Sequence, residues 1–509
     1  MLVGDWMDQW AAIFPDKTAV VFNEMVLTYR KFSERINAAA KFFDALGLKK
    51  GGRVATLLYN KPQYLEIFFA LSKLGAILVP INWRLVAPEV SHILQDSQSE
   101  IMLFESRFKP LVAEVQDQGT SQIRHFISLG ERPPTWAEDY EAGLARSTPG
   151  FRPSAAGVDQ EDAHIIMYTS GTTGQPKGAV MSQRKTFFNV LNSDIYYALT
   201  PSDVILVTRP LFHSGGLLVQ AAPVLYKGGT VILQERFRPE PALEALETNR
   251  VTVFEAASTI YKFFLADCDM SAYDLSSLKV CYTGGERVSP GLITEFHQRG
   301  ISIGQIFGQT ETSTVTWLPR EDAIRKIGSV GHPVFHGRVK IENEQGQAIQ
   351  PGETGEILVG GPIIMTEYWN SPEMTAETIK DGWLHTGDLA TQDEDGYIYI
   401  VDRKKNMIIS GGENIYPAEV EKAILEHEAV EDVAVYGVPD ERWGEVGRAV
   451  VVLKPGWKVN DEELLTFLRG RIAGYKKPKS VEFVSCLPRT AAGKIMRCKL
   501  TEGSRKQVD

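Results

Sequence analysis

An alternation of short apolar strands with helical segments constrains the fold of this chain most strongly. Arg53–Tyr59 has the apolar and β-branched character of a buried strand, Gln63–Leu74 has helical periodicity, and Ala76–Ile81 is again a strand. An amphipathic helix is expected before them, over Tyr29–Leu46. Because strand–helix–strand units build parallel sheets, this pattern predicts an α/β fold with much parallel sheet.

The alternation continues and then changes character. Helical segments such as Pro239–Thr248 separate β-rich runs at Val204–Val207, Thr230–Leu233, Val251–Phe254 and Lys279–Tyr282. After about residue 330, glycine and acidic residues mark turns between short strands, and a second boundary falls near residue 402. We therefore expect a large N-terminal domain of parallel and mixed sheets over residues 1–402, with a small β-rich subdomain over about 330–402. A small α+β C-terminal domain is expected over 403–509.

Composition narrows the class of protein and its partners. The net charge of −10 disfavours a nucleic-acid partner, because an acidic surface repels the phosphate backbone. The four cysteines form no C-x-x-C pair, which indicates neither a zinc site nor a redox pair and fits a cytoplasmic location. The longest apolar stretch, Ile67–Ile81, is too short and too polar to span a bilayer, so no transmembrane segment is expected.

A loop rich in glycine and hydroxyl groups follows the apolar run His164–Tyr168. Glycines let the backbone approach a ligand, and backbone N–H groups, hydroxyls and one ammonium suit a polyphosphate. The residues that make this cationic cup are Thr169, Ser170, Gly171, Thr172, Thr173, Gly174 and Lys177. Their spacing does not match G-x-x-x-x-G-K followed by Ser or Thr. The loop is therefore either a phosphate cradle of another design or a Ser/Thr/Gly surface turn.

Four further stretches combine glycine with polar or charged residues close to predicted strands. They are Tyr282–Arg287, Phe307–Glu311, His385–Asp388, which is expected in a turn, and Asp402–Arg403. Ligands of α/β sheets bind outside the carboxyl ends of the strands, so these loops are expected to converge on one crevice. A Thr–Glu pair can offer a hydroxyl to a phosphate and a carboxylate to Mg²⁺.

The motifs, in this order, resemble those of the adenylate-forming superfamily of AMP-binding enzymes, in particular bacterial fatty-acyl-CoA synthetases and aryl-CoA ligases. The resemblance covers about residues 10–500. It rests on the phosphate loop Thr169–Gly178, the aromatic-G-x-T-E motif Phe307–Glu311, the T-G-D motif at His385–Asp388, the stretch Asp402–Ile415, and the P-x-x-x-x-G-K motif Pro488–Lys494.

The resemblance implies a two-step reaction of a small-molecule carboxylic acid, ATP and coenzyme A. The acid attacks the α-phosphate of ATP to give an acyl-adenylate, and the CoA thiol then displaces AMP. The implied catalytic residues are Lys494, Thr310 and Glu311, of which Glu311 holds Mg²⁺. The implied ATP ligands are Thr169, Ser170, Gly171, Thr172, Thr173, Gly174 and Lys177 for the phosphates, Gly284, Gly285, Glu286, Phe307 and Gly308 around the adenine, and Asp388 and Arg403 at the ribose.

The resemblance also implies that the C-terminal domain is mobile and rotates between the two steps about a hinge at Lys405. His213 would gate the acyl pocket, and the thiol would enter past Gly411, Gly412, Glu413 and Trp443. For Trp443 and His213, purely structural roles are the alternatives.

The acid itself is predicted from the expected pocket walls. These are His213, Ala257–Tyr261, Gly284 and Thr312–Val315, which offer no Lys or Arg to pair a second carboxylate. They favour an apolar monocarboxylic acid, with a medium- or long-chain fatty acid as the preferred prediction and a hydroxycinnamate or benzoate as the alternative. An adenylation enzyme that loads a carrier protein and a nucleotide-binding regulator without turnover are the rival functions. Peripheral membrane contact and a homodimer stay open.

Overall fold

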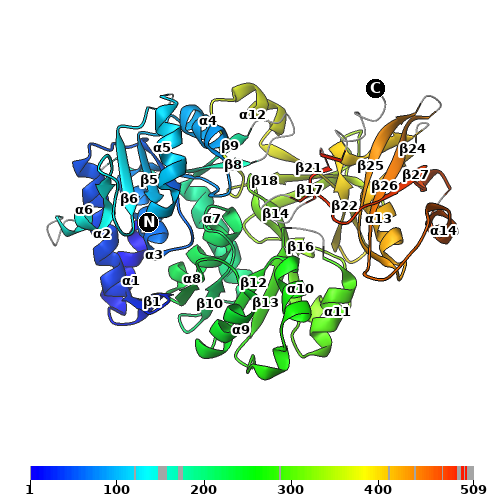
Figure 1. Cartoon of the computed structure of the whole chain (residues 1–509), viewed down its shortest axis with the longest axis horizontal. Helices are drawn as coiled ribbons and strands as arrows, with labels where there is room; N and C mark the ends of the chain where they lie inside the picture. Colours follow the sequence, from blue (N-terminus) through cyan, green and yellow to red (C-terminus); the bar gives the residue numbers. More distant parts are fainter. Residues whose placement is uncertain are drawn as a thin grey trace. The chain divides into compact units, whose positions relative to one another are not determined.

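The computed structural model of the chain describes residues 2–119, 122–146, 157–169, 176–285, 288–410, 413–440, 443–469, 471–472, 474–489, 495–497 and 499–500, without the side chains of 409, 413 and 414. These residues belong to two units (Figure 1). The first is Met1–Val339 with Val359–Leu384, and the second is Lys340–Leu358 with His385–Asp509. Residues 385–402 thus group with the C-terminal part, and the hinge at Lys405 stays a prediction.

Two large sheets form the first unit. The nine-stranded sheet has the order β16 (His332–Pro333), β15 (Ser313–Leu318), β14 (Ile303–Gln309), β13 (Val280–Gly284), β12 (Val253–Ala256), β10 (Val204–Val207), β11 (Thr230–Leu233), β1 (Thr18–Phe22) and β2 (Met25–Thr28). The eight-stranded sheet has the order β19 (Glu367–Tyr368), β9 (Lys177–Ser182), β8 (Ala163–Thr169), β4 (Ile77–Pro80), β3 (Arg53–Leu57), β5 (Ile101–Glu105), β6 (His125–Leu129) and β7 (Glu138–Asp139).

The central strands of both sheets are parallel, and antiparallel strands lie at the edges. In the nine-stranded sheet the run from β14 to β1 is parallel, whereas β15, β16 and β2 are antiparallel. In the other sheet β8 to β7 are parallel and β9 and β19 are antiparallel. The predicted α/β class with parallel and mixed sheets is confirmed.

Helices cover both sheets. They are α1 (Trp6–Ile13), α2 (Tyr29–Ala45), α3 (Pro62–Leu74), α4 (Ala87–Ser97), α5 (Lys109–Asp117), α6 (Tyr140–Ala145), α7 (Gln183–Tyr197), α8 (Ala222–Lys227), α9 (Pro239–Thr248), α10 (Ser258–Asp267), α11 (Pro290–Gln298) and α12 (Pro372–Thr378), with a π-helix at Gly215–Ala221. The main apolar core joins strands of both sheets to α2, α3, α7 and α8. A second core packs α9, α10 and α11 on the nine-stranded sheet, as seen in Figure 1.

Local chemistry explains where these helices begin and end. Helix α3 starts with Pro62, which lacks the N–H that a first turn leaves unpaired, and ends at Gly75 with φ +64°. Helix α7 starts after Ser182, whose hydroxyl accepts a hydrogen bond from the Lys185 N–H. This cap fixes the first turn of α7 and the backbone position of Lys185.

The remaining strands form two five-stranded sheets. One contains β17 (Arg338–Glu342), β18 (Gly355–Gly360), β21 (Trp383–Gln392), β20 (Ile379–Lys380) and β22 (Ile398–Arg403). The other contains β24 (Glu413–Ile415), β23 (Ile408–Ser410), β26 (Gly444–Leu453), β25 (Val430–Asp440) and β27 (Ser480–Phe483), with α13 (Pro417–Leu425) and α14 (Asp461–Phe467) in the same part of the chain.

One local prediction in this region is wrong. His385–Asp388 does not form a turn but continues strand β21, in which Asp388 pairs with Arg403 of β22. Gly387 has φ +68°, so the strand passes through a conformation that glycine adopts readily. A Gly-Asp pair is typical of turns, and only the partner strand shows that this one is extended.

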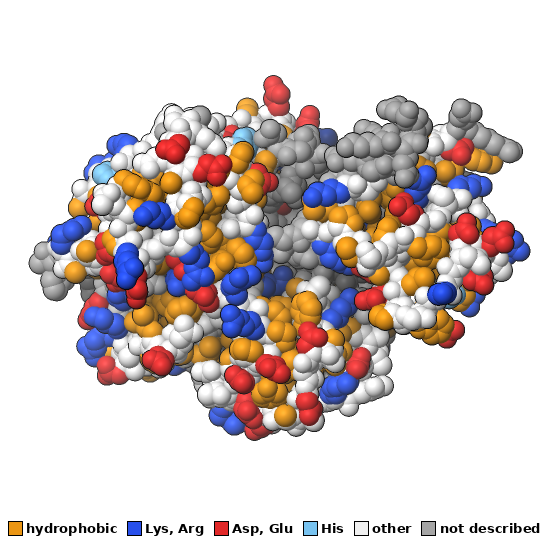
Figure 2. Space-filling model, in the orientation of Figure 1, with side chains coloured by type: hydrophobic (Ala, Val, Ile, Leu, Met, Phe, Trp, Pro, Cys, Tyr) orange, Lys and Arg blue, Asp and Glu red, His pale blue; other side chains and the backbone are white. Residues whose placement is uncertain are grey.

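The surface is mixed in character. On the face seen in Figure 2, basic and acidic side chains are interspersed, with apolar side chains between them. Within the described part of the chain, no helix combines the length and the apolar character that crossing a bilayer requires.

Candidate nucleotide- and acid-binding site

Glu311 lies where the two large sheets of the first unit meet. It sits in the turn between β14 and β15, and its Oε1 accepts hydrogen bonds from Thr169 Oγ1 at 3.3 Å and from Tyr368 Oη at 3.0 Å. Thr169 ends β8 and Tyr368 lies in β19, so both donors come from the other sheet. The fold thus brings Thr169, the first residue of the predicted phosphate loop, to the predicted Mg²⁺ carboxylate. Tyr368 was not among the predicted residues, because a Glu-Tyr-Trp sequence carries no sign of a ligand.

Lys177 stands at the far end of the phosphate loop. It pairs with Thr169 across the β8–β9 ladder, and its Nζ lies 5.5 Å from the centre of the Tyr368 ring. A cation at this distance is attracted by the ring. One end of the loop, Thr169, therefore contacts Glu311, and the other end, Lys177, lies beside the tyrosine that also contacts Glu311. Ser170, Gly171, Thr172, Thr173 and Gly174 lie outside the described residues.

The carboxylate at this position fits a magnesium ion that is bound together with ATP. Glu311 is half-buried, and Oε1 takes both hydroxyl donors, whereas Oε2 takes none from the described residues. No group of three or more His, Cys, Asp or Glu side chains that could hold a metal occurs in the described ranges. Mg²⁺ is commonly held by one or two carboxylates plus substrate phosphates, and one free carboxylate oxygen beside a phosphate loop meets that pattern.

Backbone geometry explains three glycines of the predicted nucleotide site, two by close strand packing and one by its φ angle. A Cβ on Gly284 would lie 2.3 Å from the Ile306 carbonyl oxygen, and a Cβ on Gly308 would lie 1.9 Å from that of Ser313. Gly285 is exposed and has φ +84°, a conformation that favours glycine. These glycines are required by the backbone itself, in addition to any ligand. Phe307 is half-buried in β14, and Glu286 lies outside the described residues.

A buried lysine supports the Thr310–Glu311 turn. Lys185 Nζ donates to Ser313 Oγ at 2.5 Å and to the Thr310 carbonyl oxygen at 3.4 Å. Burial lowers the pKa of Lys185 to about 7, and the nearby Glu311 carboxylate opposes this shift. The sequence gives no sign of this role, since Gln-Arg-Lys at the start of a helix usually faces solvent.

An arginine that is not one of the expected wall residues lies next to the predicted acyl gate. Arg209 Nη2 donates to Glu255 Oε1 and to the Gly284 carbonyl oxygen, both at 2.7 Å. Burial and the positive charge of Arg209 lower the pKa of His213 to about 4, so this imidazole is neutral at pH 7. His213 Nδ1 accepts a hydrogen bond from the Gly215 N–H at 3.0 Å.

The predicted ribose ligands belong to the second unit. Arg403 Nε lies 2.9 Å from Asp388 Oδ1, and Asp388 is buried. The pair joins β22 to β21. It presents a carboxylate whose position is set by a guanidinium, which suits hydroxyl groups as hydrogen-bond donors.

The predicted hinge and thiol-path residues also lie in the second unit. Lys405 is exposed in a 3₁₀ turn, Lys404–Asn406, beside Asp402, which accepts a hydrogen bond from the Ala418 N–H at 2.8 Å. Trp443 precedes β26 and is 40% exposed. Gly411, Gly412 and Lys494 lie outside the described residues, and Glu413 begins β24, with its side chain also outside them.

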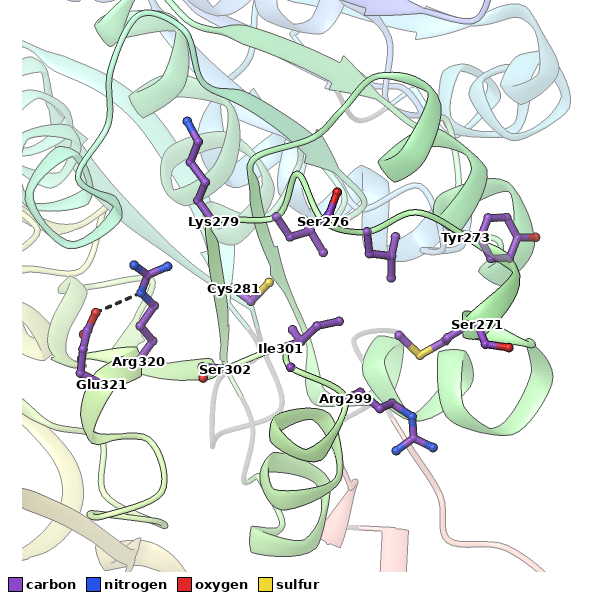
Figure 3. A pocket seen from close by; sticks show the side chains of 14 residues that line it. Ser271, Tyr273, Ser276, Lys279, Cys281, Arg299, Ile301, Ser302, Arg320 and Glu321 are labelled. Atoms are coloured by element: carbon purple, nitrogen blue, oxygen red, sulfur yellow. Dashed lines mark hydrogen bonds and ion pairs between the residues drawn. The ribbon is translucent and has the colours of Figure 1, made fainter.

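A groove of about 660 Å³ lies at the amino ends of strands β13 and β14 of the nine-stranded sheet (Figure 3). Lys279, Cys281, Ile301 and Ser302, near the amino ends of β13 and β14, form part of its wall. Burial raises the pKa of the Cys281 thiol to about 12, so it is not a nucleophile at neutral pH. Because ligands of α/β sheets bind at the carboxyl ends of strands, this groove is not the predicted nucleotide site.

Comparison with known proteins identifies the family. Residues 7–369 match the AMP-binding enzyme family, and residues 419–494 match the AMP-binding enzyme C-terminal domain. The chain is 41% identical over 498 residues to a feruloyl-CoA synthase of Amycolatopsis sp, with 97% of each chain covered. It is 35% identical over 519 residues to a long-chain-fatty-acid–CoA ligase of Bacillus subtilis, with 97% of this chain and 92% of the other covered.

A solved structure agrees over nearly the whole chain. The o-succinylbenzoate CoA synthetase (MenE) of Bacillus subtilis, in complex with its acyl-adenylate intermediate OSB-AMP, superposes with a TM-score of 0.86 at 31% identity, covering 97% of each chain. The resemblance drawn from the motifs is thereby confirmed, and this chain belongs to the AMP-binding enzyme family.

Proposed function

We propose that this enzyme converts an apolar monocarboxylic acid into its CoA thioester, and that the acid is aromatic. It is an ATP-dependent acid–CoA ligase that uses ATP, Mg²⁺ and CoA. The observation that carries the proposed site is that Thr169 and Tyr368 both donate to Glu311, with Lys177 beside the Tyr368 ring.

The residues around Glu311 act by position and charge rather than as nucleophiles. A carboxylate is a poor acylating agent and needs the α-phosphate of ATP as its electrophile. Lys177 and the loop hydroxyls hold the departing pyrophosphate, Thr310 contacts the α-phosphate, and Lys494 bridges the carboxylate and that phosphate. Glu311 would hold Mg²⁺, and the ion would supply positive charge opposite the phosphates.

After adenylation, the thiol of CoA attacks the acyl carbonyl carbon, and the bond to AMP breaks. We assign the thiol path to Gly411, Gly412, Glu413 and Trp443, and the adenosine ribose to Asp388 and Arg403. Rotation of the C-terminal domain about Lys405 withdraws Lys494 from the site and brings in the residues of the thiol path. One site thereby serves both steps.

Two observations bear on the acid. The relative that is 41% identical is named for an aromatic acid, whereas the relative at 35% is named for long-chain fatty acids. The Arg209 guanidinium beside His213 also suits an acid with a polar group better than a saturated chain. The long-chain fatty acid predicted from the sequence is the second candidate.

A panel of acids tests this proposal. Purified enzyme is given ATP, Mg²⁺ and one acid at a time: cinnamate, ferulate, benzoate, octanoate or palmitate. Pyrophosphate release and CoA-ester formation are measured separately, with a carrier protein as an alternative acceptor. We expect the cinnamates to give the highest kcat/KM with free CoA. Highest activity with palmitate would establish the second candidate, and transfer to the carrier protein alone would rule out CoA as the acceptor.

Cytoplasmic location and a homodimer are parts of the same proposal. The first is supported by four cysteines without paired spacing. The second rests on the resemblance to the family and on no contact in the structure, and light scattering of the purified enzyme tests it.

A further inference from the structure

Arg209 belongs to a network of buried polar groups in the first unit. It follows β10, and its guanidinium reaches Glu255 of β12. The Arg209 side chain is 13% exposed and that of Glu255 is 1% exposed. Gln220 of the π-helix donates to Glu255 Oε2 at 2.9 Å. Both carboxylate oxygens of Glu255 are therefore occupied, and the charge of Arg209 is neutralised.

Some N–H groups of the guanidinium have no acceptor in this network. Nη2 donates to Glu255 and Gly284, whereas Nε is buried and meets no acceptor among the described residues. Nη1 also has no acceptor in the ranges that the structure describes, and it is not one of their fully buried atoms. Nη1 is therefore the N–H group of Arg209 that can donate to a bound molecule.

Two glycines leave room at the tip of this guanidinium. A Cβ on Gly215 would lie 2.9 Å from Arg209 Cδ and 3.4 Å from Nη1. A Cβ on Gly285 would lie 3.2 Å from Nη1 and 3.9 Å from Nη2, and apart from Gly285 and its two chain neighbours no other described heavy atom lies within 4 Å of it. Gly285 is exposed, so the tip of Arg209 borders open space at the carboxyl end of β13.

We propose that Arg209 determines acid specificity by donating a hydrogen bond to a neutral oxygen at the far end of the acyl group. This inference rests on the proposed function. His213, the predicted acyl gate, lies beside Arg209, which places the guanidinium on the acyl side of the Gly284–Gly285 wall.

The Arg209–Glu255 pair is neutral overall, and this favours a neutral oxygen of the acyl group over a carboxylate. Because Glu255 already neutralises Arg209, a second carboxylate would bring two negative charges to one buried cation. A hydroxyl, methoxyl or carbonyl oxygen accepts a hydrogen bond from Nη1 without bringing this second charge. An acyl group without an acceptor leaves that N–H unpaired, and sites built to hydrogen-bond a substrate oxygen reject analogues that lack it.

Matched acids and a matched double variant test this. The acids are cinnamate, 4-hydroxycinnamate and 4-carboxycinnamate, with nonanoate and 8-hydroxyoctanoate as the alkyl pair. The variant combines Arg209→Met with Glu255→Gln, because Arg209→Met alone leaves Glu255 charged, buried and without its cation. A control variant, Arg35→Met with Glu66→Gln, removes another buried pair, in which Arg35 Nε lies 2.6 Å from Glu66 Oε1.

We expect wild-type enzyme and the control variant to prefer the hydroxylated acid by about tenfold or more in kcat/KM. In the Arg209→Met, Glu255→Gln variant, kcat/KM for the hydroxylated acid should differ from that for the unsubstituted acid by no more than about twofold. The KM for ATP should stay unchanged. An unchanged ratio, a changed KM for ATP alone, or a wild-type preference for the 4-carboxyl acid would overturn the inference. If neither enzyme forms any CoA ester, it is the proposed function that fails, and the two failures are thus distinct.

Discussion

Lys185 Nζ lies 2.5 Å from Ser313 Oγ, beneath the turn that carries Thr310 and Glu311. Ser313 has φ +58°, which is uncommon for a residue other than glycine. The lysine thus joins the first turn of α7 to a strained residue next to the proposed metal ligand. Four predictions concern this region and the two-step reaction.

The first prediction concerns stability and pH. Burial lowers the pKa of Lys185 to about 7, whereas in the unfolded chain the ammonium loses its proton only near pH 10.4. Between these values the unfolded state binds one more proton, so the free energy of unfolding rises with pH by about 1.4 kcal/mol per unit. Lys185→Met removes this rise. Urea unfolding of both proteins at pH 7, 8 and 9 measures it, and a wild-type minus variant difference that is constant with pH would contradict the assignment.

The second prediction compares Glu311 with the tyrosine that holds it. Glu311→Gln should lower the rate of pyrophosphate release by ~10²–10³ and raise the Mg²⁺ concentration required, because a charged ligand is lost. Tyr368→Phe should cost only about tenfold, the equivalent of one hydrogen bond. Tyr29→Phe is the control, since Tyr29 Oη donates to the Gly229 carbonyl oxygen at 2.6 Å and has no proposed role in the reaction. Equal losses in all three variants would point to general destabilisation instead.

The third prediction separates the two half-reactions. Lys494→Ala should reduce pyrophosphate release by ~10²–10³, because the bridging charge is lost, and spare the transfer of a supplied acyl-adenylate to CoA. Pyrophosphate release and thioester formation from a supplied acyl-adenylate are measured separately on the same preparation of enzyme. If both steps decline together, Lys494 does not act in the first step alone.

The fourth prediction concerns the hinge. Proline fixes φ near −65° and restricts the residue before it, so Lys405→Pro should block rotation about this position. Thioester formation should then be lost, while pyrophosphate release continues at a similar rate. Lys405→Ala, which removes the same side chain but leaves φ free, should retain both steps. Normal CoA turnover in the proline variant would exclude Lys405 as the hinge.

Much of the fold could be predicted from local patterns. Helix α9 spans Pro239–Thr248 as expected, and α2 ends one residue before the predicted Leu46. The strand expected at Val251–Phe254 begins two residues later, at Val253. Apolar periodicity determines that an element exists, whereas its ends depend on the neighbouring strands, which a local pattern does not contain.

The residues of the candidate site also fall into those that local sequence indicates and those that it does not. Thr169, Lys177, Glu311 and His213 could be proposed from their motifs, because phosphate and carboxylate chemistry needs these residue types at short spacing. Tyr368, Lys185 and Arg209 were not, because their partners lie 57, 128 and 46 residues away along the chain. Each sits in an ordinary helix, strand or loop sequence and acquires its role only from a contact across the fold.

The sequence by itself therefore determined the α/β class, the family and the use of ATP, since these depend on periodicity and on contiguous motifs. Only the tertiary structure decided that a buried lysine supports the Thr310–Glu311 turn and that an arginine lies beside the predicted acyl gate. The physical reason is burial. An ammonium or guanidinium is solvated almost everywhere on a chain, and its pKa, its partners and its free donors are set by the atoms that replace water around it.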